Sequence, residues 1–336
     1  MNLRPLGPIV ALGVLVALAI WGPPKPHRRS PPDGSHAGAD AAERGAGSSS
    51  DVGAERTLEV GGKVRSYYFH APAGAHAGLL PLVIVFHGGE GSPAKIASQT
   101  GFTAVADRNG FAVAYPAAID HWNDGRETTA SFGDDTGFAS ALIDQLVKSD
   151  GIDRNRVYVT GASNGGMMTL RLACERASEF AAFAVVAGSF PEGYMSRCQP
   201  ARPVPIMIIH GSEDRFIRTE GGTIPKGRRV GEGGTVVPQR DTVEFWRKHD
   251  GCQSQPETTS LPDTTDDGTT ANMTAYPGCA SDVEVIFIDI EGGGHTWPGA
   301  HKDPVGLLAG RVSRDFDASE TIWSFFRRHT LAERGG

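Results

Sequence analysis

Continuous apolar runs that alternate with helical patterns constrain the fold of this chain more than any other feature. Such runs occupy residues 82–86, 111–115, 156–160, 183–187, 205–209 and 283–288. Helical patterns occupy residues 94–108, 135–149, 164–178, 238–249 and 318–329. Strands that are apolar on both faces are expected in a parallel sheet that is covered by helices on both sides. The alternation therefore predicts an α/β fold with a doubly wound, mostly parallel sheet.

The 336 residues divide into three expected parts. Residues 9–21 form an unbroken apolar run behind Arg4, which predicts a signal peptide or signal anchor over residues 1–21. Residues 22–56 are rich in Pro, Gly, Ser and Ala. Because so few large apolar side chains cannot offset the chain entropy of folding, we expect a disordered tether there. We expect the catalytic domain over residues 57–332. We expect contact with a membrane only through the N-terminal segment, and only if that segment is not cleaved.

Charge and cysteine content narrow the class of protein. The net charge of -7 and the lack of a basic stripe argue against a nucleic-acid partner. In an exported chain, the even cysteine count indicates disulfides, and Cys174–Cys198 with Cys252–Cys279 is the simplest of three connectivities. Free buried thiols remain an alternative. Since no C-x-x-C pair occurs, we predict no metal site.

A polar stretch interrupts the alternation late in the chain. Residues 255–272 are rich in Thr, Asp and Pro and read as an exposed loop or a mobile hairpin tip, bounded by Cys252 and Cys279. A disulfide between these cysteines would limit the entropy of the loop. Asn272 begins a glycosylation sequon, which is a weak signal by itself.

The stretch GASNG at residues 161–165 follows one of the predicted strands and precedes a predicted helix. This is the setting of a nucleophile elbow, with Ser163 as nucleophile, although a serine that only caps the helix is the alternative. The backbone N–H of Asn164 would lie at the helix N-terminus and stabilise an oxyanion, so its N–H should matter more than its side chain. Gly89, in the HGG run after residues 82–86, is the expected second donor.

A nucleophilic serine needs a base to take its proton and an acid to orient that base. In α/β-hydrolases the three residues follow one another along the chain as Ser, then Asp or Glu, then His. Asp214 comes just past the run at 205–209, and Glu213 is the competing acid. His295 follows the run at 283–288 and three glycines. His210 and His301 are weaker candidates for the base. The order and the strand-end positions predict a triad of Ser163, Asp214 and His295.

Six motifs resemble one branch of the α/β-hydrolases, the polyhydroxybutyrate depolymerase and feruloyl or acetylxylan esterase branch (carbohydrate esterase family 1 type). They are HGG at 87–89, WNDGR at 122–126, DDTGF at 134–138, GASNGG at 161–166, HGSED at 210–214 and GGGHTWPG at 292–299. The resemblance covers about residues 57–330. It implies an α/β-hydrolase fold, with Ser163 as nucleophile, Asp214 orienting His295, and Gly89 and Asn164 forming the oxyanion hole. It also supports the nearest-neighbour disulfides, and it implies no cofactor.

The resemblance implies a serine esterase that is secreted or anchored to the outer face of the cell membrane. Its expected substrates are small or oligomeric esters, polysaccharide- or polyester-derived, of feruloyl, acetyl or short hydroxyalkanoate type. Trp122, Trp297 and Tyr115 either line the acyl pocket or pack in the core. A serine peptidase on the same fold and a catalytically silent cell-surface binding protein are the alternative functions.

Overall fold

The structure, a computed structural model, describes residues 52–74, 78–226, 233–300 and 308–331. The expected signal segment at 1–21, most of the expected tether and His301 lie outside the described residues. The first strand begins at Ala54, so residues 54–56 belong to the folded domain and not to the tether. These residues pair with the following strand, and this pairing supplies the backbone hydrogen bonds that their composition did not indicate.

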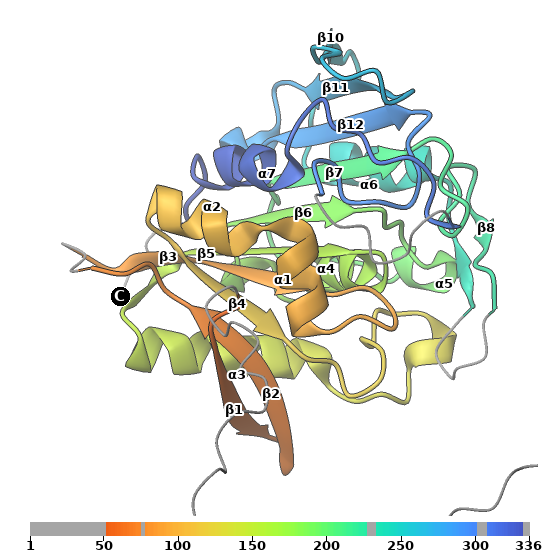
Figure 1. Cartoon of the computed structure of the whole chain (residues 1–336). Coiled ribbons are helices and arrows are strands. Elements are labelled where there is room, and N and C mark those ends of the chain that lie inside the picture. The colour runs from red at the N-terminus through yellow and green to blue at the C-terminus, as the bar shows by residue number, and fades with distance from the viewer. Residues whose placement is uncertain (1–51, 75–77, 227–232, 301–307, 332–336) are drawn as a thin grey trace, which may run out of the picture. The chain divides into compact units, whose positions relative to one another are not determined.

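One mixed sheet organises the described part of the chain (Figure 1). Its strands are β1 (Ala54–Val60), β2 (Lys63–His70), β3 (Leu80–Phe86), β4 (Ala112–Pro116), β5 (Ile152–Ala162), β6 (Ala182–Val186), β7 (Ile206–Gly211), β10 (Glu257–Ser260), β11 (Thr270–Tyr276) and β12 (Val285–Glu291). The strand order is β1-β2-β4-β3-β5-β6-β7-β12-β11-β10. The strands from β4 to β12 in this order pair in parallel, whereas the outer strands pair antiparallel. The six predicted apolar runs are the six parallel strands.

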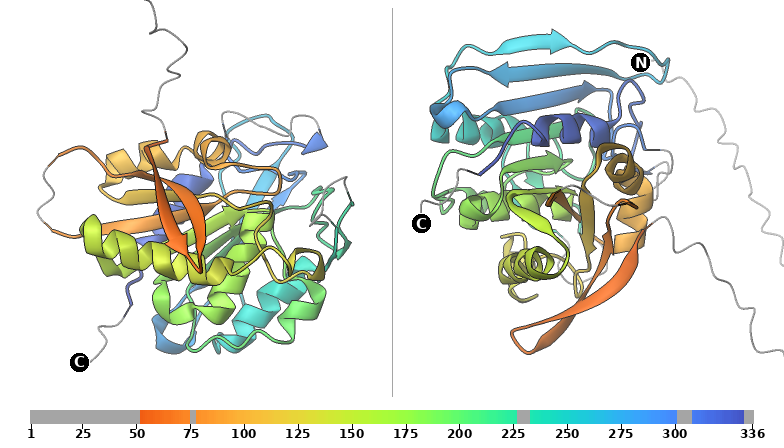
Figure 2. Two further views of the ribbon diagram at one scale, coloured as in Figure 1. Left: turned by 90° about the horizontal axis from the view of Figure 1, so that it is seen from below. Right: turned by 90° about the vertical axis from the view of Figure 1, so that its left-hand side faces the viewer.

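Helices cover both faces of this sheet (Figure 2). They are α1 (Pro93–Thr100), α2 (Phe102–Asn109), α3 (Asp135–Ser149), α4 (Asn164–Glu175), α5 (Glu192–Met195), α6 (Gln239–His249) and α7 (Ala318–Phe326). The short elements are η1 (Glu127–Thr129), η2 (Ala177–Glu179), η3 (Ala280–Asp282) and a separate pair of strands, β8 (Gly222–Thr223) and β9 (Thr235–Val236). No helix within the described ranges is long and apolar enough to cross a membrane.

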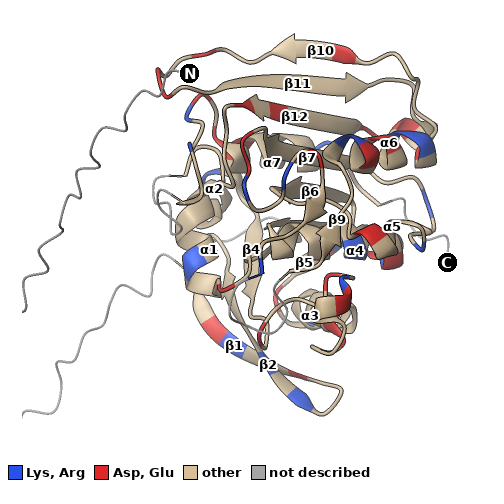
Figure 3. Ribbon diagram, turned by 90° about the vertical axis from the view of Figure 1, so that its right-hand side faces the viewer, with Lys and Arg blue, Asp and Glu red and all other residues tan. Residues whose placement is uncertain are grey.

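Two apolar layers, one on each face of the sheet, explain why the central strands are apolar throughout. Buried side chains of α3, α4 and α6 share one layer with Leu82 and Ile84 of β3, and those of α1, α2 and α7 share the other with Val83 and Val85. Successive strand residues point to opposite faces, so every position of β3 enters a core. β3, β6 and β7 accordingly carry no Lys, Arg, Asp or Glu (Figure 3). The doubly wound α/β prediction is confirmed.

Two predicted elements differ in detail from the structure. The helix expected over 94–108 is two helices, because Gly101 adopts φ 64 and its N–H closes α1 on Ala97 O. The polar stretch at 255–272 contains β10 and the first residues of β11, which pair as a hairpin and extend the sheet beyond β12, so the hairpin expectation holds and the loop expectation does not. Its strands were missed because their side chains are exposed or only partly buried, so no apolar face marks them.

All four cysteines are paired. Cys174 is bonded to Cys198, and Cys252 is bonded to Cys279, in the nearest-neighbour arrangement. The second bond joins the segment just after α6 to the segment that follows β11, so it closes the stretch that contains the β10–β11 hairpin. Asn272 lies within β11, where its side-chain oxygen accepts a hydrogen bond from Ser260 Oγ at 2.8 Å.

Candidate active site

The predicted site residues gather at one edge of the sheet. Gly89, Ser163, Asp214 and His295 follow β3, β5, β7 and β12, which are parallel strands whose carboxyl ends meet at this edge. A cleft of about 710 Å³ opens there, and Gly89, Ser163 and His295 line it. Asp214 is buried directly behind His295.

Ser163 is the single residue between β5 and α4. It has φ 57 and ψ -118, a conformation that residues with a Cβ rarely adopt. A Cβ on Gly161 would lie 2.4 Å from Gly165 O, and a Cβ on Gly165 would lie 2.3 Å from Phe86 O. Glycine is therefore required on both sides of the serine. Although Ser163 occupies the N-cap position of α4, its side chain makes no capping hydrogen bond, which disfavours the capping alternative.

Asp214 and His295 form a direct hydrogen bond. His295 Nδ1 donates to Asp214 Oδ2 at 2.7 Å, and the N–H groups of Phe216 and Ile217 donate to Asp214 Oδ1 at 2.8 Å each. Because a carboxylate oxygen accepts, Nδ1 carries the proton and Nε2 is left as a base. Burial alone would raise the pKa of the Asp214 carboxyl, but the nearby His295 and these hydrogen bonds hold this pKa below its ordinary value.

The competing acid and the competing base have other contacts. Glu213 is exposed and pairs with Arg311 at 3.1 Å between Oε2 and Nη1. His210 is buried in the core, where its Nε2 donates to Ile217 O at 2.8 Å and holds the turn that contains Asp214. His210 Nε2 also lies 3.9 Å from Asp214 Oδ2, but of the two histidines only His295 is hydrogen-bonded to Asp214 and lines the cleft.

Hydrogen bonds to the Gly88 carbonyl orient the loop that carries Gly89. The Gly88 oxygen accepts from His87 Nδ1 at 2.7 Å and from Gly91 N at 3.1 Å. Since the peptide is planar and trans, the Gly89 N–H points away from that oxygen. The loop lies against the serine, because a Cβ added to Gly88 would be 3.4 Å from Ser163 Cβ. This geometry suits an N–H donor beside Ser163.

His87 holds this loop as a neutral imidazole. Its Nδ1 donates to Gly88 O, while its Nε2 accepts from Ala118 N at 3.2 Å. A protonated ring could not accept the second bond. Burial lowers the pKa of His87 to about 4, although the hydrogen bond to Gly88 O acts in the opposite direction.

The side chain of Asn164 makes more contacts than its sequence position suggested. It is 2% exposed, and its Oδ1 accepts from Trp122 N at 2.9 Å. Its Nδ2 donates to Trp122 O at 3.0 Å and to Asp124 Oδ2 at 2.6 Å. The motif at 161–166 points only to the backbone N–H of Asn164 and gives no sign of these side-chain partners. The motif at 122–126 was the available signal, because it pairs an aspartate with an arginine near a tryptophan.

The three aromatic residues considered for an acyl pocket are packing residues. Trp122, Trp297 and Tyr115 are at most 1% exposed, and none lines the cleft. Trp122 Nε1 donates to His87 O at 2.9 Å, and Trp297 Nε1 donates to Ser319 Oγ at 3.1 Å. The Tyr115 hydroxyl lies 2.9 Å from Thr103 Oγ1. Each ring can be buried because its polar atom has a partner inside the protein.

Aliphatic side chains form part of the cleft wall instead. Met167, Ile217 and Ile224 line it and belong to one small apolar cluster with Val236. Phe216 packs its ring against His295, with 5.1 Å between the ring centroids. These residues come from α4, from the turn after Asp214 and from the β8–β9 region, none of which carried a recognisable pocket motif.

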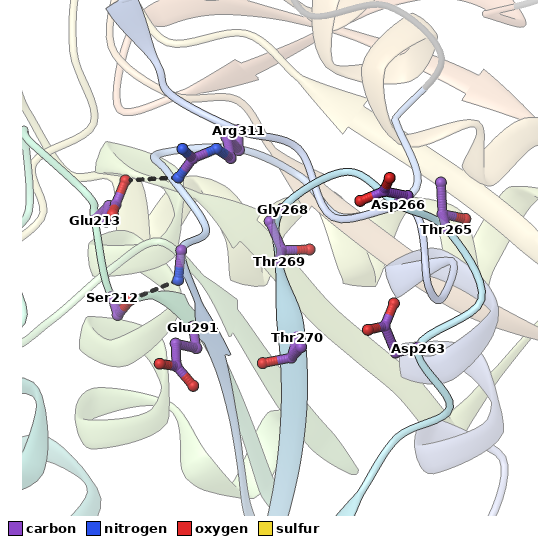
Figure 4. A pocket seen from close by; sticks show the side chains of 11 residues that line it. Ser212, Glu213, Asp263, Thr265, Asp266, Gly268, Thr269, Thr270, Glu291 and Arg311 are labelled. Carbon is purple, nitrogen blue, oxygen red and sulfur yellow. Dashed lines mark hydrogen bonds and ion pairs between the residues drawn. The ribbon is translucent and has the colours of Figure 1, made fainter.

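A second cavity, of about 530 Å³, lies beside the loop that precedes Asp214 (Figure 4). Its lining includes four carboxylates, from Glu213, Asp263, Asp266 and Glu291, together with Arg311. Neither Ser163 nor His295 lines it, so the cleft at Ser163 is the candidate reaction site. Within the described ranges, no three His, Cys, Asp or Glu side chains group as a metal site.

Known proteins resemble this chain in both fold and sequence. A solved acetyl xylan esterase from Aspergillus awamori superposes with a TM-score of 0.52 at 18% identity, covering 73% of this chain and 94% of that one, which supports the fold. The protein called "Putative esterase NocK" from Nocardia uniformis subsp. tsuyamanensis is 31% identical over 280 residues, or 80% of this chain and 81% of that protein. Feruloyl esterase B of Piromyces equi is 28% identical over 224 residues, or 64% of this chain and only 39% of that protein.

Together, the sheet order, the strand-end site and these relatives define a carboxylic ester hydrolase with the α/β-hydrolase fold. Residues 65–199 match the family described as Esterase PHB depolymerase. The chain belongs to this family, as the resemblance of its motifs predicted.

Backbone strain at Ser163 predicts a stability difference between two variants of this serine. Ser163→Gly should be about 1 kcal/mol more stable than Ser163→Ala, because only glycine adopts φ 57 without strain, while its greater chain entropy offsets part of the gain. Urea unfolding of both variants measures the difference. Ala162→Gly, one residue earlier in β5, is the control and should be less stable than the wild type. A less stable Ser163→Gly would contradict the assigned strain.

The buried neutral His87 predicts a loss of stability in mild acid. Its pKa is about 4 in the folded state and 6.5 in an ordinary setting, so between these values the unfolded chain binds the extra proton. Stability due to His87 is complete above pH 6.5 and falls toward pH 4, by about 2 kcal/mol at pH 5. Urea unfolding at pH 7.5 and pH 5 should show this loss in the wild type and a smaller one in His87→Asn. Equal losses in both proteins would rule the assignment out.

Proposed function

We propose that the protein hydrolyses esters through an acyl-enzyme, with Ser163 as nucleophile, His295 as general base and acid, and Asp214 orienting the imidazole. The observation that carries this proposal is the 2.7 Å hydrogen bond from His295 Nδ1 to Asp214 Oδ2, at a cleft that Ser163 and His295 both line. The strained turn at Ser163 and the adjacent N–H groups support the same roles.

Each step uses a group that the cleft supplies. His295 Nε2 takes the hydroxyl proton as Ser163 Oγ attacks the ester carbonyl, and Asp214 stabilises the imidazolium that forms. The N–H groups of Gly89 and Asn164 donate to the oxyanion. When the intermediate collapses, the alcohol leaves with the proton from His295. Water then loses a proton to His295 and attacks the acyl-enzyme, and His295 gives this proton to Ser163 Oγ as the acid leaves, which restores both residues.

The apolar wall supports esters whose acyl group packs on Met167, Ile217 and Ile224. Feruloyl, acetyl and short hydroxyalkanoate esters are the proposed substrates, either small or attached to a polysaccharide or polyester. The names of the feruloyl and acetylxylan esterases among the relatives support this range.

We place the enzyme outside the cytoplasm, either secreted or held at the outer face of the membrane. The two disulfides support an oxidising compartment. Digestion of the protein by protease added to intact cells, or its recovery from the medium, tests this location. Recovery only from the cytosol, with four free thiols, would refute it.

Ser163→Ala should reduce kcat/KM for p-nitrophenyl acetate by at least about 10⁴-fold, because the acyl-enzyme cannot form. A fluorophosphonate probe should label the wild type and leave folded Ser163→Ala unlabelled. Ser212→Ala is the matched control, since Ser212 lines the second cavity, and it should keep its activity and labelling. Full activity in Ser163→Ala would remove Ser163 from the mechanism.

The apolar wall of the cleft predicts how the preference among acyl groups responds to a change at Ile224. Ile224→Ala removes apolar surface from the cleft, so kcat/KM for feruloyl and hydroxybutyryl esters should fall by roughly tenfold, while acetyl esters change less. Assays of p-nitrophenyl or methyl esters of each acyl group, with the corresponding amides, measure this preference. Equal losses for acetyl and larger acyl groups would show that the acyl group binds elsewhere, and faster amide hydrolysis would favour a peptidase.

A further inference from the structure

The mechanism leaves a buried ion pair beside the nucleophile without a role. Asp124 is 0% exposed, and its side chain accepts from Arg126 Nε at 3.1 and 2.9 Å and from Thr129 Oγ1 at 2.8 Å. Arg126 Nη2 lies 2.8 Å from the same carboxylate. Burying a charge costs free energy unless the charge is paired and hydrogen-bonded. These bonds offset that cost for Asp124 and Arg126, but they do not explain why charged residues occur here.

The carboxylate of Asp124 also contacts the residue that follows the nucleophile. Asn164 Nδ2 donates to Asp124 Oδ2 at 2.6 Å, and the rest of the amide is bonded to the backbone of Trp122 in both directions. Turning this amide over would point its oxygen at the Trp122 carbonyl and the Asp124 carboxylate. Only one orientation is therefore stable, and it fixes Cβ and the adjoining backbone N–H of Asn164.

The same loop reaches the second proposed oxyanion donor and the cleft wall. Trp122 Nε1 donates to His87 O, the carbonyl just before the Gly88–Gly89 turn. On its other side, Arg126 Nη1 donates to Gly233 O at 2.6 Å, next to the β8–β9 pair, and Arg126 itself lines the cleft. Residues 122–126 thus join the elbow, the Gly89 loop and one wall of the cleft.

We propose that Asp124 is a positioning residue for ester hydrolysis. Its buried carboxylate locks the Asn164 side chain and thereby holds the Asn164 N–H in the direction of the developing oxyanion. This inference rests on the proposed function, because it assumes that this N–H stabilises the transition state. An interaction that acts mainly on the transition state changes kcat more than KM.

Asp124→Asn tests the role with little change of shape. We expect kcat for p-nitrophenyl acetate to fall by roughly tenfold or more, with KM changed less than about threefold, because an oxyanion donor is displaced and not removed. Asp250→Asn is the matched control: Asp250 is also 0% exposed and hydrogen-bonded, to His249 Nδ1 and Val204 N, and does not line the cleft. Its kcat should stay within about twofold of the wild type.

A double variant tests whether Asp124 acts through the Asn164 side chain, and it keeps the proposal testable if Asp124→Asn folds poorly. Asn164→Ala removes that side chain but keeps the backbone N–H, so it should lower kcat about as much as Asp124→Asn does. The double variant Asn164→Ala/Asp124→Asn should then have a kcat within about threefold of that of Asn164→Ala. A kcat of the double variant that falls by the product of the two single losses, or a folded Asn164→Ala or Asp124→Asn with unchanged kcat, would overturn the positioning role. Failure of the proposed function would look different, because Ser163→Ala would then stay active.

Discussion

The close contact between the first turn of α4 and the end of β3 is the constraint on which the candidate active site depends. Gly165 has no room for a Cβ, since Phe86 O would lie 2.3 Å away and His87 O 2.6 Å away. The helix can therefore begin directly against the strand that carries the Gly88–Gly89 loop. This approach puts Ser163, the N-terminus of α4 and the loop together, and it forces the backbone of Ser163 into a positive φ.

Burial makes the polar groups at this edge interdependent. Asp214 gives up hydration but accepts hydrogen bonds from His295, Phe216 and Ile217. His87 stays neutral inside the protein and uses both ring nitrogens to hold the neighbouring loop. In a medium of low dielectric constant, such bonds are stronger than in water, and an unpaired group is more costly. Each of these hydrogen-bonded atoms would consequently be destabilising without its partner.

The sequence predicted the parts of the fold that follow from apolar periodicity. β3, β7 and β12 were recognisable because both of their faces enter a core, and the strand-end positions of Asp214 and His295 followed from β7 and β12. The β10–β11 hairpin was not recognisable as strands, because it gains its backbone bonds from a sheet edge and buries little. The break at Gly101 depends on one left-handed residue, which a helical pattern averaged over many positions conceals.

Side-chain roles within the site were harder to predict, for a related reason. Hydrophobicity places Trp122 equally well in a core or in a pocket, and the indole N–H bond to His87 O, made across 35 positions of the chain, decides between them. The amide of Asn164 meets Trp122 and Asp124 across 42 and 40 positions. No local rule identifies such partners. Of the WNDGR motif only Arg126 therefore lines the cleft, and the same residue specificity arises because a tryptophan, a carboxylate and a guanidinium all need polar partners in a buried space beside Ser163.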